Sequence, residues 1–144
     1  HIHRATTAAF ELATSVACLS GIQHFAVSPE GMRHVPGFVQ KFLQHLPAMW
    51  QDVHFIDGYP GKYYIVARKS ANGWYVAGLN ASGESKILHL KLDLSFLKGR
   101  TGKLISCQDP QRPNSFKQQD VTVDQNGQLG ISLNNNDGFV AVFQ

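Results

Sequence analysis

Hydrophobic positions follow a helical period in the first third of the chain and a strand period from residue 63 onward. Residues 5–19 are rich in alanine and leucine, and Thr6 or Thr7 is available as the N-cap of a helix. The apolar residues of this predicted helix run nearly all the way round it. Such a helix normally has protein on more than one side, so we expect it to need a cover.

A short strand and a second helix are expected next. Residues 22–27 alternate between apolar and polar, between Gly21 and a turn at residues 28–31. From Pro36 to Leu46 the apolar residues recur at helical spacing with polar residues opposite, which predicts an amphipathic helix that ends before Pro47. The order helix, strand, helix is typical of a slice of an α/β layered domain, which does not close a domain by itself.

Residues 52–62 separate the two periods. The Asp57-Gly58 and Pro60-Gly61 pairs favour turns, because glycine accepts positive φ and proline fixes φ near −65°. Several aromatic residues flank them. We therefore predict a well-packed turn where the hydrophobic period changes, with Asp57 as a turn residue.

After residue 62 the chain is expected to form short strands. Asn72-Gly73 joins strands at 63–68 and 74–79 and favours a type I′ hairpin turn. Leucines alternate with polar residues over 88–94, which indicates a strand with one buried and one wet face. Further strands are expected at 102–107, 117–123, 128–133 and 139–143, with turns at Asn126-Gly127 and Asp137-Gly138. Strands spaced near ten residues apart without helices between them predict an antiparallel β-sandwich of seven or eight strands.

Composition and charge argue against nucleic-acid and membrane partners. With 43% hydrophobic and 16% charged residues, the 144-residue chain is typical of a globular protein of about one domain. The net charge is +3 and the basic residues are scattered, with Arg68-Lys69 as the sole adjacent pair. We therefore expect no nucleic-acid partner, which would need a basic stripe. No apolar run approaches the roughly 20 residues of a membrane span, so we expect no membrane partner.

The two cysteines and the first residue do not indicate the cellular compartment of the protein. Cys18 and Cys107 are predicted to be buried thiols that do not pair. No signal-peptide pattern is present. Because the chain begins with His1, it is predicted to be a processed chain or a fragment.

Residue spacing indicates no catalytic or metal centre. The ten carboxylates lie mostly in predicted turns or on polar strand faces, and the seven histidines lack the His-x-x-x-His spacing of a zinc site. No Gly-x-Ser-x-Gly elbow or glycine-rich phosphate loop occurs. Aromatic residues that stack on sugars are a further candidate, although each is mainly expected in the core: Trp50, Tyr59, Trp74 and Tyr75.

Several stretches closely resemble the C-terminal end of family 97 glycoside hydrolases, and the likeness covers almost the whole chain. They are residues 5–13 (ATTAAFELA), 20–26 (SGIQHFA), 28–31 (SPEG), 55–62 (FIDGYPGK) and 64–68. This resemblance implies a parent enzyme that is a bacterial α-glucosidase or α-galactosidase. The family has an N-terminal β-sandwich, a catalytic (β/α)₈ barrel and a C-terminal β-sandwich.

On this resemblance the chain is an α+β fragment of two parts. Residues 1–51 are the last helix, strand and helix of the (β/α)₈ barrel, and residues 52–144 are the C-terminal antiparallel sandwich. The first helix would then be apolar all round because it has lost its neighbours in the barrel. The expected partners are the missing N-terminal and barrel domains, and the expected location is the periplasm or the exterior of a bacterium.

The resemblance implies no catalytic, cofactor or metal residue in this chain. The family's catalytic carboxylates and calcium-binding glutamates lie earlier in the barrel, so calcium is expected in the parent enzyme only. The family commonly has Ala-Asp-Ser-Pro where this chain has Ala26-Val27-Ser28-Pro29. Because the C-terminal ends of barrel strands face the active site, His24 and Ser28 are the candidate barrel-rim positions near a sugar.

The leading hypothesis is therefore an accessory domain that supports the barrel of a glycoside hydrolase and has no turnover of its own. Two alternatives remain open. One is a carbohydrate-binding module with an oligosaccharide ligand, and the other is a protein-interaction domain that self-associates through an uncovered apolar helix. The choice between α-glucosides and α-galactosides, and between retention and inversion, is also open because the deciding carboxylates would lie upstream.

Overall fold

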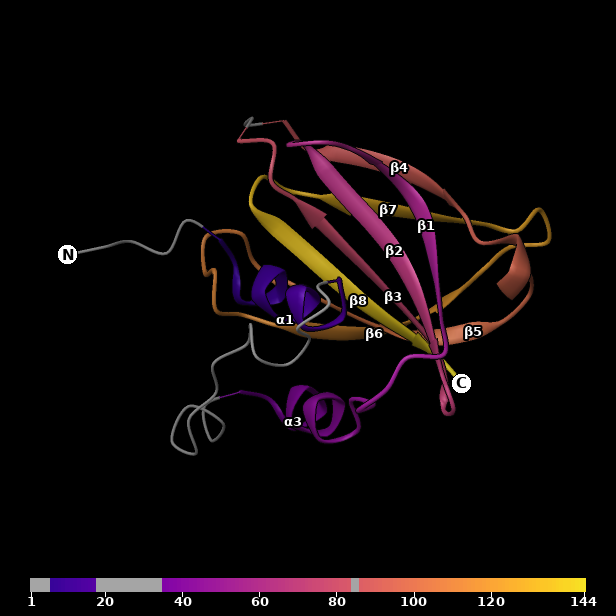
Figure 1. Ribbon diagram of the computed structural model, residues 1–144. Coiled ribbons are helices and arrows are strands. Elements are labelled where there is room, and N and C mark those ends of the chain that lie inside the picture. Colours follow the sequence, from indigo (N-terminus) through magenta and orange to yellow (C-terminus); the bar gives the residue numbers. More distant parts are fainter. Residues whose placement is uncertain (1–5, 18–34, 84–85) are drawn as a thin grey trace.

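The computed structural model describes residues 6–17, 35–83 and 86–144 (Figure 1). Within these residues the helices are α1 (Ala8–Ala17) and α3 (Gly37–Gln44), and a short 3₁₀ turn, η2, spans Ser95–Leu97. The predicted strand at 22–27, the turn at 28–31 and Cys18 lie outside the described residues. None of the described helices is long and apolar enough to span a bilayer.

The described strands form two antiparallel sheets. The larger sheet has the strand order β1-β2-β3-β8-β5-β6, and β4 pairs with β7 in the smaller one. The strands are β1 (Asp52–Tyr59), β2 (Tyr63–Ser70), β3 (Gly73–Asn80), β4 (Leu88–Asp93), β5 (Thr101–Ser106), β6 (Lys117–Thr122), β7 (Gln128–Leu133) and β8 (Asp137–Phe143). The predicted antiparallel β-sandwich is thus confirmed, and β4 shows the predicted alternation of exposed and more buried positions.

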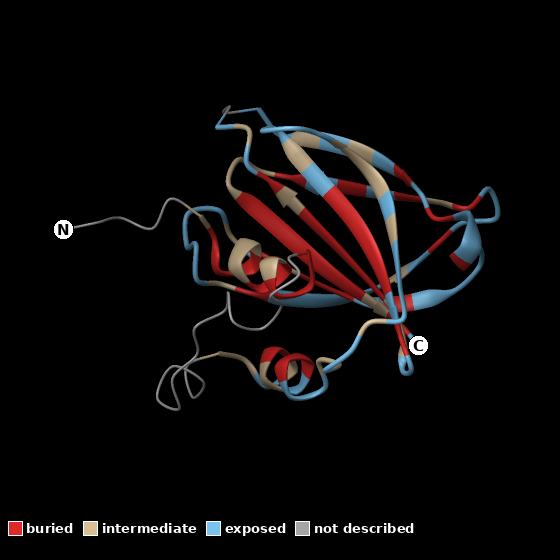
Figure 2. Ribbon diagram, viewed as in Figure 1, coloured by how far each residue is buried: buried red, intermediate tan, exposed pale blue. Residues whose placement is uncertain are grey.

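The large sheet is buried on both faces. Side chains on one face pack against α1 and α3, among them Val66, Ala77 and Val140. Alternate residues such as Ile65 and Val76 point the other way and pack against β4 and β7. Figure 2 shows the resulting burial along the middle of β2, β3 and β8. The core therefore has two layers, one on each side of the large sheet.

Helix α1 is fastened to the start of β8. Thr7 is its N-cap, because its Oγ1 accepts a hydrogen bond from the Phe10 amide at 3.0 Å. The same hydroxyl donates to Oδ1 of Asp137 at 2.8 Å, and the Thr7 amide donates to the Asn136 carbonyl at 3.0 Å. Most α1 side chains are buried against the large sheet. The large sheet therefore covers this helix, and its origin in a barrel stays a prediction.

Asp137 makes the stability of this junction depend on pH. Burial raises the pKa of the Asp137 carboxyl above its ordinary value, although hydrogen bonds from Thr7 and Gly138 act in the opposite direction. The folded chain then holds this proton more tightly than the unfolded chain does. Its contribution to stability is therefore lost as the pH rises from near 4 through the raised pKa.

We expect Asp137→Asn to remove this loss. Urea unfolding of both proteins between pH 4 and pH 8 should show the wild-type chain losing stability relative to the variant as the pH rises. The comparison cancels the other titrating groups, which the two proteins share. Parallel pH profiles would contradict the prediction.

Helix α3 packs through the predicted apolar stripe. Val39, Phe42 and Leu43 are buried, and the Phe42 ring lies edge-on to the ring of Tyr75, 5.8 Å between centroids. The Tyr75 hydroxyl donates to the carbonyl of His45, the C-cap residue, at 3.2 Å. Burial raises the pKa of Tyr75, so its phenol stays neutral and keeps donating. These contacts hold the end of α3 against β3.

The segment predicted as a turn is mostly strand β1. Only residues 60–62 form the turn to β2, and Asp57-Gly58 lies inside the strand. The register shifts between Phe55 and Asp57, where a bulge interrupts the ladder. Oδ1 of Asp57 accepts from the Gly58 amide at 2.8 Å and from the Tyr63 hydroxyl at 3.3 Å. Because a bulge breaks the period of two, the sequence pattern did not indicate this strand.

Two predicted turns also differ in detail. Ala71 and Asn72 do connect β2 to β3, but Asn136 is the one non-glycine residue with positive φ in the described part of the chain. A type I′ turn needs positive φ at both central residues, so that assignment is wrong. The Asp137-Gly138 pair begins strand β8 and is not a turn. The turn before β8 uses Asn136 instead, at φ 57°.

Candidate functional site

Most described aspartates serve local backbone geometry. Asp52, Asp93, Asp109 and Asp124 each accept a hydrogen bond from a backbone amide between one and four residues ahead. Asp120 forms an exposed ion pair with Lys103 across β5 and β6. These are the turn and surface roles predicted for them. The four aspartates bonded to backbone amides shape local turns and do not converge on one substrate position.

The histidines are dispersed. The ring of His45 contacts the Lys41 carbonyl at the end of α3, and His89 contacts Ser132 on the exposed side of β4. In the ranges 6–17, 35–83 and 86–144, no group of three or more His, Cys, Asp or Glu side chains could hold a metal ion. The calcium implied for the parent enzyme stays a prediction. The barrel-rim candidates His24 and Ser28 lie outside the described residues.

Cys107 is a free, buried thiol at the end of β5. Its Sγ lies 3.3 Å from the carbonyl oxygen of Asp109. The prediction of a buried thiol is confirmed for this cysteine.

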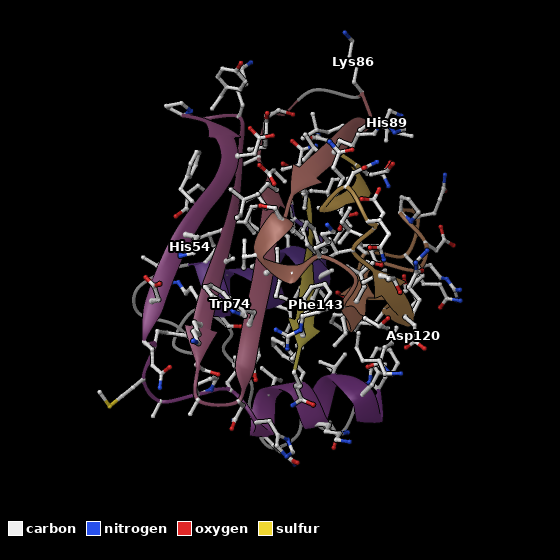
Figure 3. The ribbon with its side chains drawn as sticks, turned by 90° about the vertical axis from the view of Figure 1, so that its right-hand side faces the viewer. His54, Trp74, Lys86, His89, Asp120 and Phe143 are labelled. Atoms are coloured by element: carbon white, nitrogen blue, oxygen red, sulfur yellow. The ribbon has the colours of Figure 1, made fainter. Side chains whose placement is uncertain are left out.

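Three aromatic rings meet on the face of the large sheet opposite to the helices. His54 of β1, Trp74 of β3 and Phe96 of η2 have ring centroids between 4.7 and 5.1 Å apart, and Figure 3 shows His54 and Trp74 side by side. Their planes are tilted by 52° to 69°, so they pack against one another and form no flat stacking surface. The sequence gives no signal for this cluster, because its members come from three separate elements.

The four predicted sugar-stacking residues are not brought together. Tyr75 is buried in the core under the helices, and Trp50 packs edge-on against it at 5.2 Å. Trp74 belongs to the tilted cluster. Tyr59 is the member of this set that is largely exposed, at the end of β1. The structure therefore gives no platform built from all four.

An apolar groove of about 440 Å³ lies beside the turn from β1 to β2. Gly58 shapes it, because its φ of 152° is unfavourable for other residues and a Cβ there would approach the Tyr63 carbonyl oxygen to 2.5 Å. Aromatic side chains dominate its wall, which is lined by Phe55, Gly58, Tyr59, Pro60, Gly61, Lys62, Tyr63, Tyr64, Leu79 and Ala81. Such a groove offers mainly hydrophobic contact, with Lys62 and the tyrosine hydroxyls as its polar groups.

A second, more polar cleft of about 310 Å³ lies where β5 and β6 diverge from β7. Lys117, Gln119 and Ser132 are among the polar residues along it. Residues of β6 and β7 both line it. Among the described residues neither cleft holds a group of three His, Cys, Asp or Glu side chains that could bind a metal ion.

The chain is similar to parts of larger glycosidases. It is 38% identical over 74 residues to a probable retaining alpha-galactosidase of Streptomyces bingchenggensis, an alignment that covers 51% of this chain and 12% of that protein. It is 24% identical over 102 residues to a retaining alpha-galactosidase of Bacteroides thetaiotaomicron, covering 68% of this chain and 15% of the relative. The chain therefore spans only a small part of these relatives.

The chain is also similar to parts of solved glycosidase structures. The crystal structure of a beta-arabinopyranosidase superposes with a TM-score of 0.84 at 33% identity, over 96% of this chain and 21% of that one. A glycoside hydrolase family 97 enzyme from Pseudoalteromonas sp. strain K8 has a TM-score of 0.76 at 19% identity, over 99% of this chain and 23% of its own, which shows the shared fold.

The family described as "Glycosyl-hydrolase 97 C-terminal, oligomerisation" matches residues 49–144, which include every strand of both sheets. This match covers the sandwich, the groove beside Tyr59 and the tilted aromatic cluster. The resemblance seen in the sequence is thereby confirmed, and the chain belongs to the glycosyl-hydrolase 97 C-terminal family.

Proposed function

We propose that this chain is the C-terminal accessory part of a glycoside hydrolase, where it supports the catalytic barrel and performs no turnover. The observation that carries this proposal is the packing of α1 and α3 into the large sheet. Both helices precede residue 49, where the family match begins. The sandwich therefore packs against the two helices that precede it in the chain.

The contact between the helices and the large sheet is mainly hydrophobic. Leu12 and Val16 of α1 and Val39, Phe42 and Leu43 of α3 are buried in the cluster that they share with the sheet. Each such side chain contributes about 1.5–3 kcal/mol relative to an exposed one. Separating the helices from the sheet would expose all of them. An upstream domain that ends in these helices is thus held to the sandwich as one body, which supports the assignment of residues 1–51 to the end of a barrel.

The relatives favour galactose-like sugars for the parent enzyme. Two of them are named alpha-galactosidases, and the similar structure at 33% identity is named a beta-arabinopyranosidase. α-Galactosides and β-L-arabinopyranosides share their ring stereochemistry and differ in the substituent at C5. We infer that the parent enzyme acts on sugars of this configuration in preference to α-glucosides.

We expect the purified chain to release no nitrophenol from 4-nitrophenyl α-galactoside, α-glucoside or β-L-arabinopyranoside. The described carboxylates are engaged in turns and surface pairs, and hydrolysis requires two carboxyl groups facing one bond. Release measured by absorbance should equal that of buffer. Hydrolysis that co-purifies with the chain through successive columns would overturn the proposal.

A further inference from the structure

Strand β6 turns polar side chains toward the smaller sheet. Gln119 lies opposite Leu104 in the β5–β6 ladder, and Leu104 is buried in the core between the two sheets. Lys117 lies opposite Ser106 in the same ladder, two residues from Gln119, so both side chains are on that side of the large sheet. Both are exposed. Strand β6 therefore presents an amide and an ammonium group to the polar cleft of about 310 Å³.

The lining of this polar cleft combines hydrogen-bonding groups with apolar surface. Gln108, just after β5, lines it together with Lys117 and Gln119. Within the described part of the chain no hydrogen bond or ion pair engages these three side chains, so their polar groups are available to a ligand. Val121, half-buried on the same side of β6, and the buried Ile131 of β7 supply the apolar surface.

The charges along the polar cleft balance. Lys117 is the basic residue of its lining and Asp137 is the acidic one. Oδ1 of Asp137 accepts hydrogen bonds from the Thr7 hydroxyl and the Gly138 amide, so this carboxyl group is held within the fold. The other polar side chains of the lining are amides and hydroxyls, which both donate and accept hydrogen bonds. A neutral ligand with several hydroxyl groups therefore suits this lining better than a strongly charged one.

A peptide strand is a poorer occupant than such a ligand. Strand β6 is an edge of the large sheet, and it carries the exposed charges of Lys117 and Asp120. Charged side chains on an edge strand oppose pairing with another chain. A saccharide needs no strand to pair with, because side chains bind its hydroxyl groups and apolar residues contact the carbon face of its ring.

We propose that the polar cleft binds a short neutral saccharide, whose hydroxyl groups accept hydrogen bonds from Gln108, Lys117 and Gln119. A ring would rest its apolar face on Val121 and Ile131. The volume lies at the lower end of the about 300–1,000 Å³ of typical ligand sites, which suits a monosaccharide or disaccharide. None of the four predicted sugar-stacking aromatic residues lines this cleft.

Such a site would add a binding role to the proposed accessory function. A sugar chain held on the sandwich has a raised effective concentration at a catalytic domain on the same polypeptide. The choice of an α-galactoside as a test ligand rests on the proposed function of the parent enzyme. The site itself rests on the lining of the cleft.

Titration with melibiose, an α-galactoside, and with maltose tests the inference. In the ¹⁵N-labelled chain, the side-chain amide signals of Gln108 and Gln119 should shift saturably with at least one of the sugars. Gln119→Ala should raise the Kd of that sugar about fivefold, the effect of one lost hydrogen bond. Gln118→Ala is the matched control, because Gln118 is the adjacent exposed glutamine and lies opposite Ile105, on the helix side of the sheet. It should leave the Kd unchanged, and circular dichroism should show that both variants are folded.

Three outcomes overturn the inference. The first is that neither sugar shifts these amide signals. The second is a Kd that is the same in Gln119→Ala as in the wild-type chain, or that rises equally in the Gln118 and Gln119 variants. The third is a Kd that rises in Tyr59→Ala but not in Gln119→Ala, which would place the sugar in the groove beside the turn from β1 to β2. None of these results affects the accessory role, which fails separately if the purified chain hydrolyses glycosides.

Discussion

Replacing Gly138 with valine is expected to lower the free energy of unfolding by about 3 kcal/mol, near the upper end of overpacking costs. A Cβ at this position would lie 2.8 Å from the Gly78 carbonyl oxygen, 2.9 Å from Cα of Phe10 and 3.2 Å from Cβ of Ala13. Two of these atoms are backbone and cannot turn aside. The valine would therefore push α1 away from β8 and loosen the contact on which the proposed support of the barrel depends.

The control for this substitution is Gly130→Val in β7. The nearest atom to a Cβ at Gly130 is the Leu90 carbonyl oxygen at 4.0 Å, and the position is exposed. Valine suits a strand, so this variant should be as stable as the wild-type chain or slightly more so. Urea unfolding measures both. Hydrogen exchange of the α1 amides should quicken only in Gly138→Val, and equal stability of the two variants would contradict the packing argument.

The sequence pattern predicted those elements whose burial has a regular period. The stripe of α3, the alternation of β4 and the range of β7 agree with the structure because each has one face toward a core. Strand β1 was missed because its bulge breaks the alternation after Phe55. The sequence pattern also did not predict that the large sheet packs against α1, for a different reason. The large sheet is buried on both faces, and periodicity within one segment does not reveal what packs on the second face.

The sequence indicated the aromatic residues around the groove beside the turn from β1 to β2, but not their exposure. The aromatic residues between positions 55 and 64 stand out by composition, and the pattern suggested that they pack inside a turn. Their exposure follows from the strand order, which places β1 at one edge of the large sheet. That order is set by long-range pairings such as β3 with β8 and β5 with β8. Local spacing cannot fix these pairings, so it cannot tell an edge strand from a central one.

The two faces of the chain thus have different tasks on this account. The middle of the helix side binds the preceding helices through the cluster around Leu12 and Phe42, whereas its margin at β1 leaves an apolar patch open. The opposite face is closed by β4 and β7. The support proposed for the barrel therefore depends on the helix side of the sheet.

Truncating Phe139 to alanine is expected to cost about 3–5 kcal/mol of unfolding free energy. Phe139 is 1% exposed and lies in the cluster between the two sheets. Its ring also fills the space over Gly78, where a Cβ would lie only 2.3 Å from the ring atom Cε1. Removing the ring leaves a cavity that rigid strands on both sides cannot close. Because domains are stable by only about 5–15 kcal/mol, the variant should unfold at a much lower urea concentration.

Phe55→Ala makes the same chemical change at an exposed position of strand β1. With a ring that is 63% exposed, its loss should alter the stability of the monomer by about 0.5 kcal/mol or less. Urea unfolding of the Phe139→Ala and Phe55→Ala variants beside the wild-type chain measures the difference. A loss in Phe55→Ala as large as that in Phe139→Ala would contradict the exposed position of Phe55.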